Sequence, residues 1–81
     1  MRAYVLIEAA VGMASDIARG IQKSSFSEAK LVGVEAVTGP FDVIAVLESD
    51  DLDKLGRSIT DGIQRVEGVQ RTTTCLVVKL G

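Results

Sequence analysis

The sequence VTGPFDV at residues 37–43 decides the fold, because it joins two apolar runs through a very short turn. Its Thr38-Gly39-Pro40 core is a turn signal, since glycine permits backbone angles closed to other residues and proline stiffens the chain. We expect one strand before the turn, over residues 31–37, and another after it, over residues 41–47. So close a connection makes the two strands an antiparallel hairpin.

The sequence before the hairpin and the sequence after it each contain one strand pattern and one helix pattern. Before it, residues 3–10 form an apolar strand run, and residues 13–23 place apolar side chains at helical spacing. After it, Ser49 or Asp50 is expected to cap a helix whose apolar stripe runs from residue 52 to residue 66. Gly68 suits the end of that helix, and a last strand is expected over residues 69–80.

The predicted element order is therefore βαββαβ, the split β-α-β or ferredoxin-like arrangement. Right-handed crossovers place the first and third strands in the middle of the sheet, in the order 4-1-3-2. We expect an α+β fold with one four-stranded antiparallel sheet and two helices on one face. It forms a single domain over residues 1–81.

Both faces of the central strands are apolar. In the first strand Val5 and Ile7 lie on one face, whereas Tyr4 and Leu6 lie on the other, and the third strand shows the same double pattern. A strand with one wet face would alternate apolar and polar residues. Two helices cover only one face, so the simplest cover for the other is a sheet from a second subunit. The sequence therefore predicts a dimer; the alternative is a monomer with an unusually apolar face.

Composition excludes several classes of protein. The chain has 81 residues, a net charge of -2, no His and 4% aromatic residues. Without His, a Ser-His-Asp triad is impossible, and scattered basic residues give no footprint for direct DNA binding. We expect no membrane association and no cofactor, because no long apolar run or signal peptide is visible. We also expect no metal, because the acidic cluster of Glu48, Asp50, Asp51 and Asp53 is more typical of a capped helix end than of a metal site. A cytoplasmic location is expected, with Cys75 buried as a small apolar residue in the last strand.

Asp42 is the most informative polar residue, because it sits among apolar neighbours at the mouth of the hairpin. Its carboxylate could accept a hydrogen bond from a ligand's ammonium group, beside backbone groups that grip a carboxylate. The alternative is that Asp42 hydrogen-bonds the amides of its own turn and has a structural role.

Thr72 and Thr74 form a second candidate region. They share a face of the last strand with Gln70 and give a polar end to an otherwise apolar surface. Hydroxyl groups placed in this way could line a small pocket at a subunit boundary. The alternative is the ordinary preference of threonine for strands.

These features resemble the ligand-binding domain of the Lrp/AsnC family of transcription regulators, also called the RAM domain. The resemblance covers residues 3–6, 37–43 and 68–78, and the family pattern of Gly, any residue, an aromatic and Asp falls on Gly39, Pro40, Phe41 and Asp42. It implies a dimeric α/β sandwich, with dimers assembled into rings that are commonly octamers. It also implies effectors that are usually free amino acids, bound between dimers by Gly39–Asp42 and by the region of Gln70, Thr72 and Thr74.

The sequence also departs from the family in two places. It begins at the first strand, so we expect a stand-alone sensor without the helix-turn-helix domain, acting through full-length family regulators or elsewhere. The usual Pro-Gly turn is also missing from residues 24–30.

Two other classes share this topology. One is the dimeric α+β barrel monooxygenases and isomerases, which use His, Trp, Asn or aromatic-lined pockets; this chain has no His, Asn or Trp and three aromatic residues, so we expect no enzyme. The other is the ACT-like regulatory domains, and the Gly-x-Phe-Asp turn favours the Lrp/AsnC interpretation over these.

Overall fold

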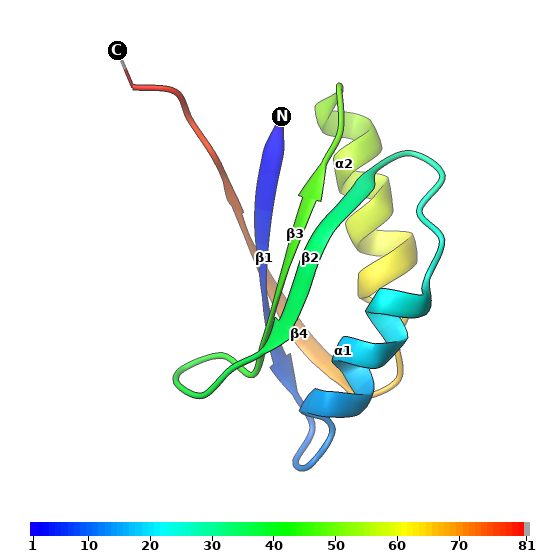
Figure 1. Cartoon of the computed structure of the whole chain (residues 1–81), viewed down its shortest axis with the longest axis vertical. Coiled ribbons are helices and arrows are strands. Elements are labelled where there is room, and N and C mark those ends of the chain that lie inside the picture. Colours follow the sequence, from blue (N-terminus) through cyan, green and yellow to red (C-terminus); the bar gives the residue numbers. More distant parts are fainter. Residues whose placement is uncertain (81) are drawn as a thin grey trace.

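The computed structural model describes residues 1–80 and shows the predicted order of elements (Figure 1). The described residues form β1 (Arg2–Ala9), α1 (Ala14–Lys23), β2 (Lys30–Ala36), β3 (Val43–Glu48), α2 (Leu52–Ser58), the π-helical turn η1 (Ile59–Ile63) and β4 (Val69–Leu76).

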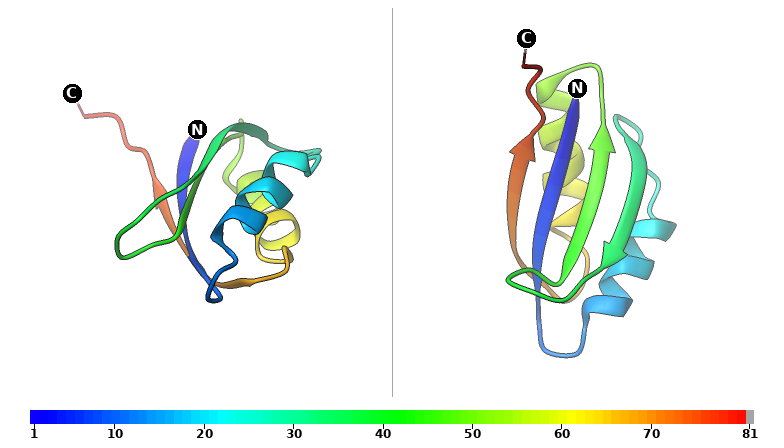
Figure 2. Two further views of the ribbon diagram at one scale, coloured as in Figure 1. Left: turned by 60° about the horizontal axis from the view of Figure 1, so that its bottom comes forward. Right: turned by 60° about the vertical axis from the view of Figure 1, so that its left-hand side comes forward.

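The four strands form one antiparallel sheet in the order β2-β3-β1-β4. Read from the other edge this is 4-1-3-2, so the predicted topology is confirmed. The helices lie together on one side of the sheet, and the other side carries no element of the described chain (Figure 2). The ferredoxin-like fold class is therefore confirmed.

The core lies between the sheet and the helices. On the sheet, the odd-numbered side chains of β1 up to Ile7 and those of β3 are fully buried, and they pack against the inward stripe of each helix. The buried apolar residues are Ala3, Val5, Ile7, Ile17, Ile21, Val43, Ala45, Leu47, Leu55, Ile59 and Ile63. Leu52, predicted as part of the second stripe, is instead 52% exposed, because it occupies the first turn of α2 beyond the core.

Several element ends differ from the prediction. β3 begins at Val43 rather than at residue 41, because the preceding Asp42 is used in the turn. β4 ends at Leu76 rather than at residue 80, because β1 begins at Arg2 and offers no neighbour further on. A last backbone hydrogen bond of 2.9 Å runs from the Val77 amide to the Arg2 carbonyl.

The cap of α2 was also predicted wrongly. Asp51 is the N-cap, and its carboxylate accepts hydrogen bonds from the amides of Asp53 and Lys54 at 2.7 and 3.1 Å. The hydrogen bonds from these amides lower the pKa of Asp51 below its usual value. Ser49 instead donates its hydroxyl to the carbonyl of Glu28 at 2.8 Å, which fixes the loop before β2.

Candidate functional site

The β2–β3 turn holds Asp42 in a braced position. Gly39 has a φ of 137°, which other residues rarely adopt, so the turn depends on this glycine. The Asp42 amide donates to the Ile7 carbonyl, and the Asp42 carbonyl accepts from the Val37 amide, both at 2.9 Å. The side chain adds a third link, because its Oδ2 atom accepts a hydrogen bond of 2.8 Å from the Ala9 amide.

This brace differs from the structural role predicted for Asp42. The carboxylate accepts from an amide at the end of β1, not from the amides of its own turn. The site is the point where the pairing of β1 with β4 shifts, between Glu8 and Ala9. The Asp42 carboxylate accepts the hydrogen bond of the Ala9 amide at this irregular end of β1.

Asp42 also borders a hollow at the start of α1, which we call the Asp42 pocket. Its lining residues are Ala9, Ala10, Val11, Gly12, Ala14, Ser15 and Asp42. The N-cap position of α1 is Met13, which has no side-chain oxygen and makes no capping hydrogen bond. The amides of the first helical turn are therefore donors beside an acidic acceptor.

The sequence analysis missed this contribution from residues 9–15. The signal was present, because Gly12 is followed by methionine where a helix usually begins with Ser, Thr, Asp or Asn. Gly12 has a φ of 79°, so the loop turns sharply into the helix. The backbone amides of the hairpin turn were predicted as donors for a ligand. The amides at the start of α1 are further donors beside Asp42.

The threonine region lies on the other side of β1. Thr72 pairs with Ile7 and Thr74 pairs with Val5, so both belong to the helix-bearing face. Gln70 does not continue this alternation, because the register shift places Val69 opposite Ala9 and leaves Gln70 without a partner in β1. The Thr72 hydroxyl oxygen accepts a hydrogen bond of 2.8 Å from Gln64 Nε2. Thr74 borders a hollow between α2 and β4, together with Leu52 and Leu76.

One chain does not bring these candidate residues together. Val43, next to Asp42, pairs with Ile7 from one side, and Thr72 pairs with Ile7 from the other. Two strand spacings separate such positions by about 10 Å. Asp42, Thr72 and Thr74 each border a different hollow of the chain. A single cleft formed by all three regions needs residues from another copy.

The face of the sheet away from the helices is apolar at its centre. We call it the open face, and it consists of Tyr4, Leu6, Ile44, Val46, Thr73 and Cys75. Tyr4 is 39% exposed, whereas the neighbouring Val5 on the helix-bearing face is fully buried. Cys75 is exposed, so its predicted burial is wrong for the single chain. Its register opposite Tyr4 turns it away from the helices.

Ion pairs border the open face at both ends. Arg2 and Glu48 pair across β1 and β3, with Arg2 Nε donating to Glu48 Oε2 at 2.7 Å. The hydrogen bond from the Arg2 side chain lowers the pKa of Glu48 below its usual value. At the other end Arg71 lies 3.9 Å from the Glu8 carboxylate. An apolar centre with a charged rim is the usual layout of a protein–protein interface.

Two kinds of feature are absent from residues 1–80. No group of three His, Cys, Asp or Glu side chains gathers in the way a metal site requires. No helix in the described part of the chain is long and apolar enough to span a membrane.

The structure is a small module with the ferredoxin-like fold. The model of the "Lrp/AsnC ligand binding domain" family matches residues 2–80, so the chain belongs to this family. A comparison with curated protein sequences gave no significant match.

Solved structures show the same fold. TTHA0845 from Thermus thermophilus superposes with a TM-score of 0.84 at 30% identity, covering 99% of this chain and 95% of that one. Escherichia coli AsnC gives 0.83 at 14% identity, covering 98% of this chain and 51% of its own. The Neisseria meningitidis transcriptional regulator NMB0573, solved as a complex with L-Met, gives 0.77 at 20% identity, covering 96% and 49%. The chain thus spans about half the length of these two regulators, and its family is that of a ligand-binding domain.

Proposed function

We propose that this module senses a free amino acid, and that the Asp42 pocket recognises its charged main-chain groups. The observation that carries the proposal is a carboxylate beside a helix N-terminus without a side-chain cap. An amino acid brings an ammonium and a carboxylate into one small space, and either charge left unpaired after desolvation is costly. Asp42 offers an acceptor for the first, and the amides of α1 offer donors for the second.

The remaining predicted contacts come from a second subunit in this proposal. Gln70, Thr72 and Thr74 lie beyond β1 from Asp42, so another copy must bring its own set to the pocket. The apolar open face supports a dimer, and further assembly into an octamer-like ring would place the two sets across a shared cleft. The L-Met bound to NMB0573 supports an amino acid as the kind of ligand.

We further propose that the module acts by binding and not by catalysis. The absence of His, Asn and Trp leaves few of the groups that barrel enzymes of this topology use. A bound effector would change the assembly of the module, or its pairing with full-length regulators in the cytoplasm, and so influence transcription or amino acid metabolism.

Calorimetric titration with the common amino acids tests this proposal. Asp42→Asn keeps an oxygen that can accept the Ala9 amide but removes the charge that an ammonium group needs. We expect the variant to bind about 10 to 100 times more weakly, the range for a lost hydrogen bond to a charged group. Its melting temperature should remain near that of the native protein.

Asp42→Ala removes both the charge and the brace, so it should weaken binding and also lower the melting temperature. Asp50→Ala, at an exposed carboxylate outside the pocket, is the matched control and should change neither property. If Asp42→Asn binds every amino acid as the native protein does, Asp42 has a structural role alone. The proposal would then be wrong about this residue.

A further inference from the structure

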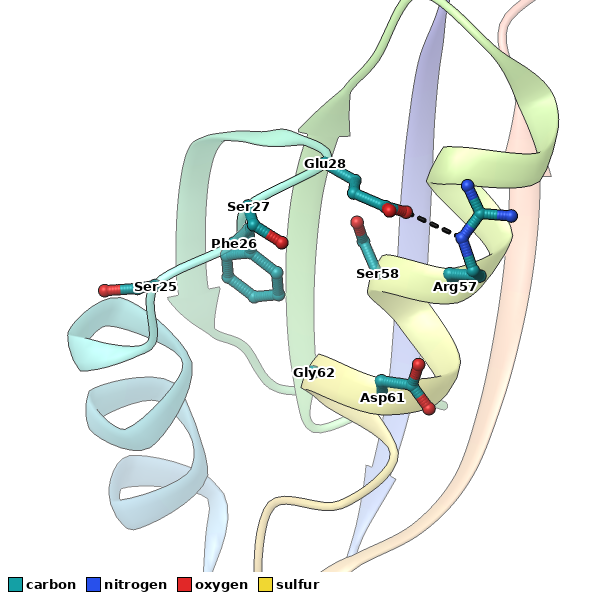
Figure 3. Close-up of a pocket in the computed structure, with 8 residues that line it drawn as sticks. All are labelled: Ser25, Phe26, Ser27, Glu28, Arg57, Ser58, Asp61 and Gly62. Carbon is teal, nitrogen blue, oxygen red and sulfur yellow. Dashed lines mark hydrogen bonds and ion pairs between the residues drawn. The ribbon is translucent and has the colours of Figure 1, made fainter.

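A pocket of about 200 Å³ lies on the helical side of the molecule, away from the hairpin turn (Figure 3). It opens between the α1–β2 loop and α2 with its π-helical turn. We call it the loop pocket, and its lining residues are Ser25, Phe26, Ser27, Glu28, Arg57, Ser58, Asp61 and Gly62. All of these residues come from one chain, so the pocket exists without a second subunit.

Three contacts hold the walls of the loop pocket in place. The Phe26 ring packs directly against Gly62, where any side chain would overlap the ring. Glu28 accepts a hydrogen bond of 2.7 Å from Arg57 Nε, and its carbonyl accepts the Ser49 hydroxyl at 2.8 Å. The α1–β2 loop is thus fastened to α2 through Arg57, to η1 through Gly62 and to the β3–α2 connection through Ser49.

The π-helical turn shapes the floor of this pocket. The Gln64 amide donates to the Ile59 carbonyl at 2.9 Å, five residues earlier, so the helix holds one extra residue in this turn. Such turns occur often at functional sites. Here the turn places Gly62 against the Phe26 ring, and the adjacent Asp61 also lines the pocket.

The pocket presents both signs of charge within a short span. Arg57 uses Nε for Glu28, so the two terminal nitrogens of its guanidinium group remain available as donors. Asp61 follows in the π-helical turn, where its carboxylate lies 3.6 Å from the Arg65 guanidinium group. Figure 3 shows the Ser27 and Ser58 hydroxyls directed between the loop and the helix, whereas Ser25 points away.

We propose that the loop pocket is a second effector site, which binds a small zwitterion such as an amino acid within a single subunit. The ligand carboxylate would bond the terminal nitrogens of Arg57 and the Ser27 hydroxyl, as guanidinium and carboxylate pair well. The ligand ammonium would lie against the Asp61 and Glu28 carboxylates. A phosphate group suits the site poorly, because two carboxylates surround the single guanidinium.

This inference goes beyond the proposed function, because it needs neither Asp42 nor a second subunit. NMR titration of the full-length ¹⁵N-labelled chain tests it, with glycine, L-alanine, L-serine and L-threonine as probes. We expect saturable shifts of the amides at residues 25–28 and 57–62. Acetate and methylammonium, which each carry one of the two charges, should bind more weakly by about tenfold or more.

Two variants separate the ligand contacts from the fold. Asp61→Asn leaves the Arg57–Glu28 pair intact and should weaken zwitterion binding by about tenfold. Arg57→Gln should weaken it by at least as much, and circular dichroism spectra report whether the loop remains folded. Arg19→Gln is the control, because this exposed side chain pairs with Asp16 on α1, outside the pocket lining, and the variant should bind as the native chain does.

The outcomes distinguish the two sites. Asp42→Asn should leave the shifts at residues 25–28 and 57–62 unchanged. Shifts confined to residues 9–15, 39–42 and 70–74 would overturn the loop pocket and leave the proposed function standing. Acetate binding as tightly as glycine, or Asp61→Asn binding as the native chain does, would also overturn a zwitterion site. No shifts at residues 25–28 and 57–62 with any probe would have the same meaning.

Discussion

The two faces of the sheet have similarly apolar sequences but very different surroundings. On the helix-bearing face Val5, Val43 and Leu47 are fully buried. On the open face Tyr4 is 39% exposed, and Leu6 and Ile44 are half-buried. Apolar side chains on a strand therefore indicate that a face is covered, but not by what. The chain supplies the cover for one face, and the other is available to a second copy.

The largest expected effect is on the covered face. Leu47→Ala removes buried methyl groups from the middle of the core and should lower the free energy of unfolding by about 2–5 kcal/mol. Its neighbour Val46 lies on the open face, so Val46→Ala should cost clearly less when the protein is dilute. Urea unfolding of both variants at the same low concentration checks this. Equal losses would mean that the two faces are equally covered within one chain.

A charged substitution on the open face should separate the subunits without unfolding them. Ile44→Asp places an unpaired carboxylate at the centre of the proposed interface, and burying it there is costly. We expect the dissociation constant of the assembly to rise by about a hundredfold, or about 2.7 kcal/mol. Circular dichroism should show an unchanged fold, because Ile44 points away from the core.

Gln22→Asp, on the exposed side of α1, is the matched control for this substitution. It introduces the same charge on the helical surface and should leave the assembly unchanged. Loss of the fold in Ile44→Asp would contradict the view that this face packs only against another chain.

The reactivity of Cys75 should differ between the single chain and the associated chain, and this effect is expected to be smaller. The thiol is exposed in one chain and lies on the open face opposite Tyr4. Its reaction with a thiol reagent should become about tenfold slower once the protein is concentrated enough to associate. The reason is that only chains whose open face is uncovered react. The Ile44→Asp variant should react at the fast rate at every concentration. A rate that does not depend on concentration would place Cys75 outside the interface.

The smallest expected effect is on the dependence of the protein's stability on pH. The hydrogen bond from Arg2 lowers the pKa of Glu48 below its usual value of 4.5, so the pair stabilises the fold above that value. This contribution is lost as the pH falls through the depressed pKa of the folded state. Glu48→Gln should therefore make stability less dependent on pH below about 5. A melting curve that keeps the full acid dependence in this variant would contradict the role of the pair.

The sequence predicted the order of the strands and both apolar faces, because these follow from period-two patterns and from short connections. The ends of the elements were less predictable, since they depend on tertiary partners. β4 stops at Leu76 where its neighbour β1 begins, and Asp51 takes the cap because Ser49 is used by the Glu28 carbonyl. The spacing of the apolar residues did not indicate the π-helical turn. The position of Gly62 in that turn depends on its contact with Phe26, which is a tertiary contact.

The candidate site was predictable only in parts. Asp42 stands out in the sequence, but its bond to the Ala9 amide depends on a strand bulge that no local pattern shows. Thr72 and Thr74 share a face, as predicted, yet they lie across β1 from Asp42. Whether the two regions line one cleft depends on a neighbouring copy, and a single sequence does not state how copies are arranged.

The central claim is that the open face is covered by a second copy of this chain. Light scattering coupled to size-exclusion chromatography, at micromolar concentration, tests it most directly. We expect a mass of at least twice 8.6 kDa for the native protein, and a lower mass for Ile44→Asp. A mass of 8.6 kDa for the native protein at these concentrations would contradict the claim.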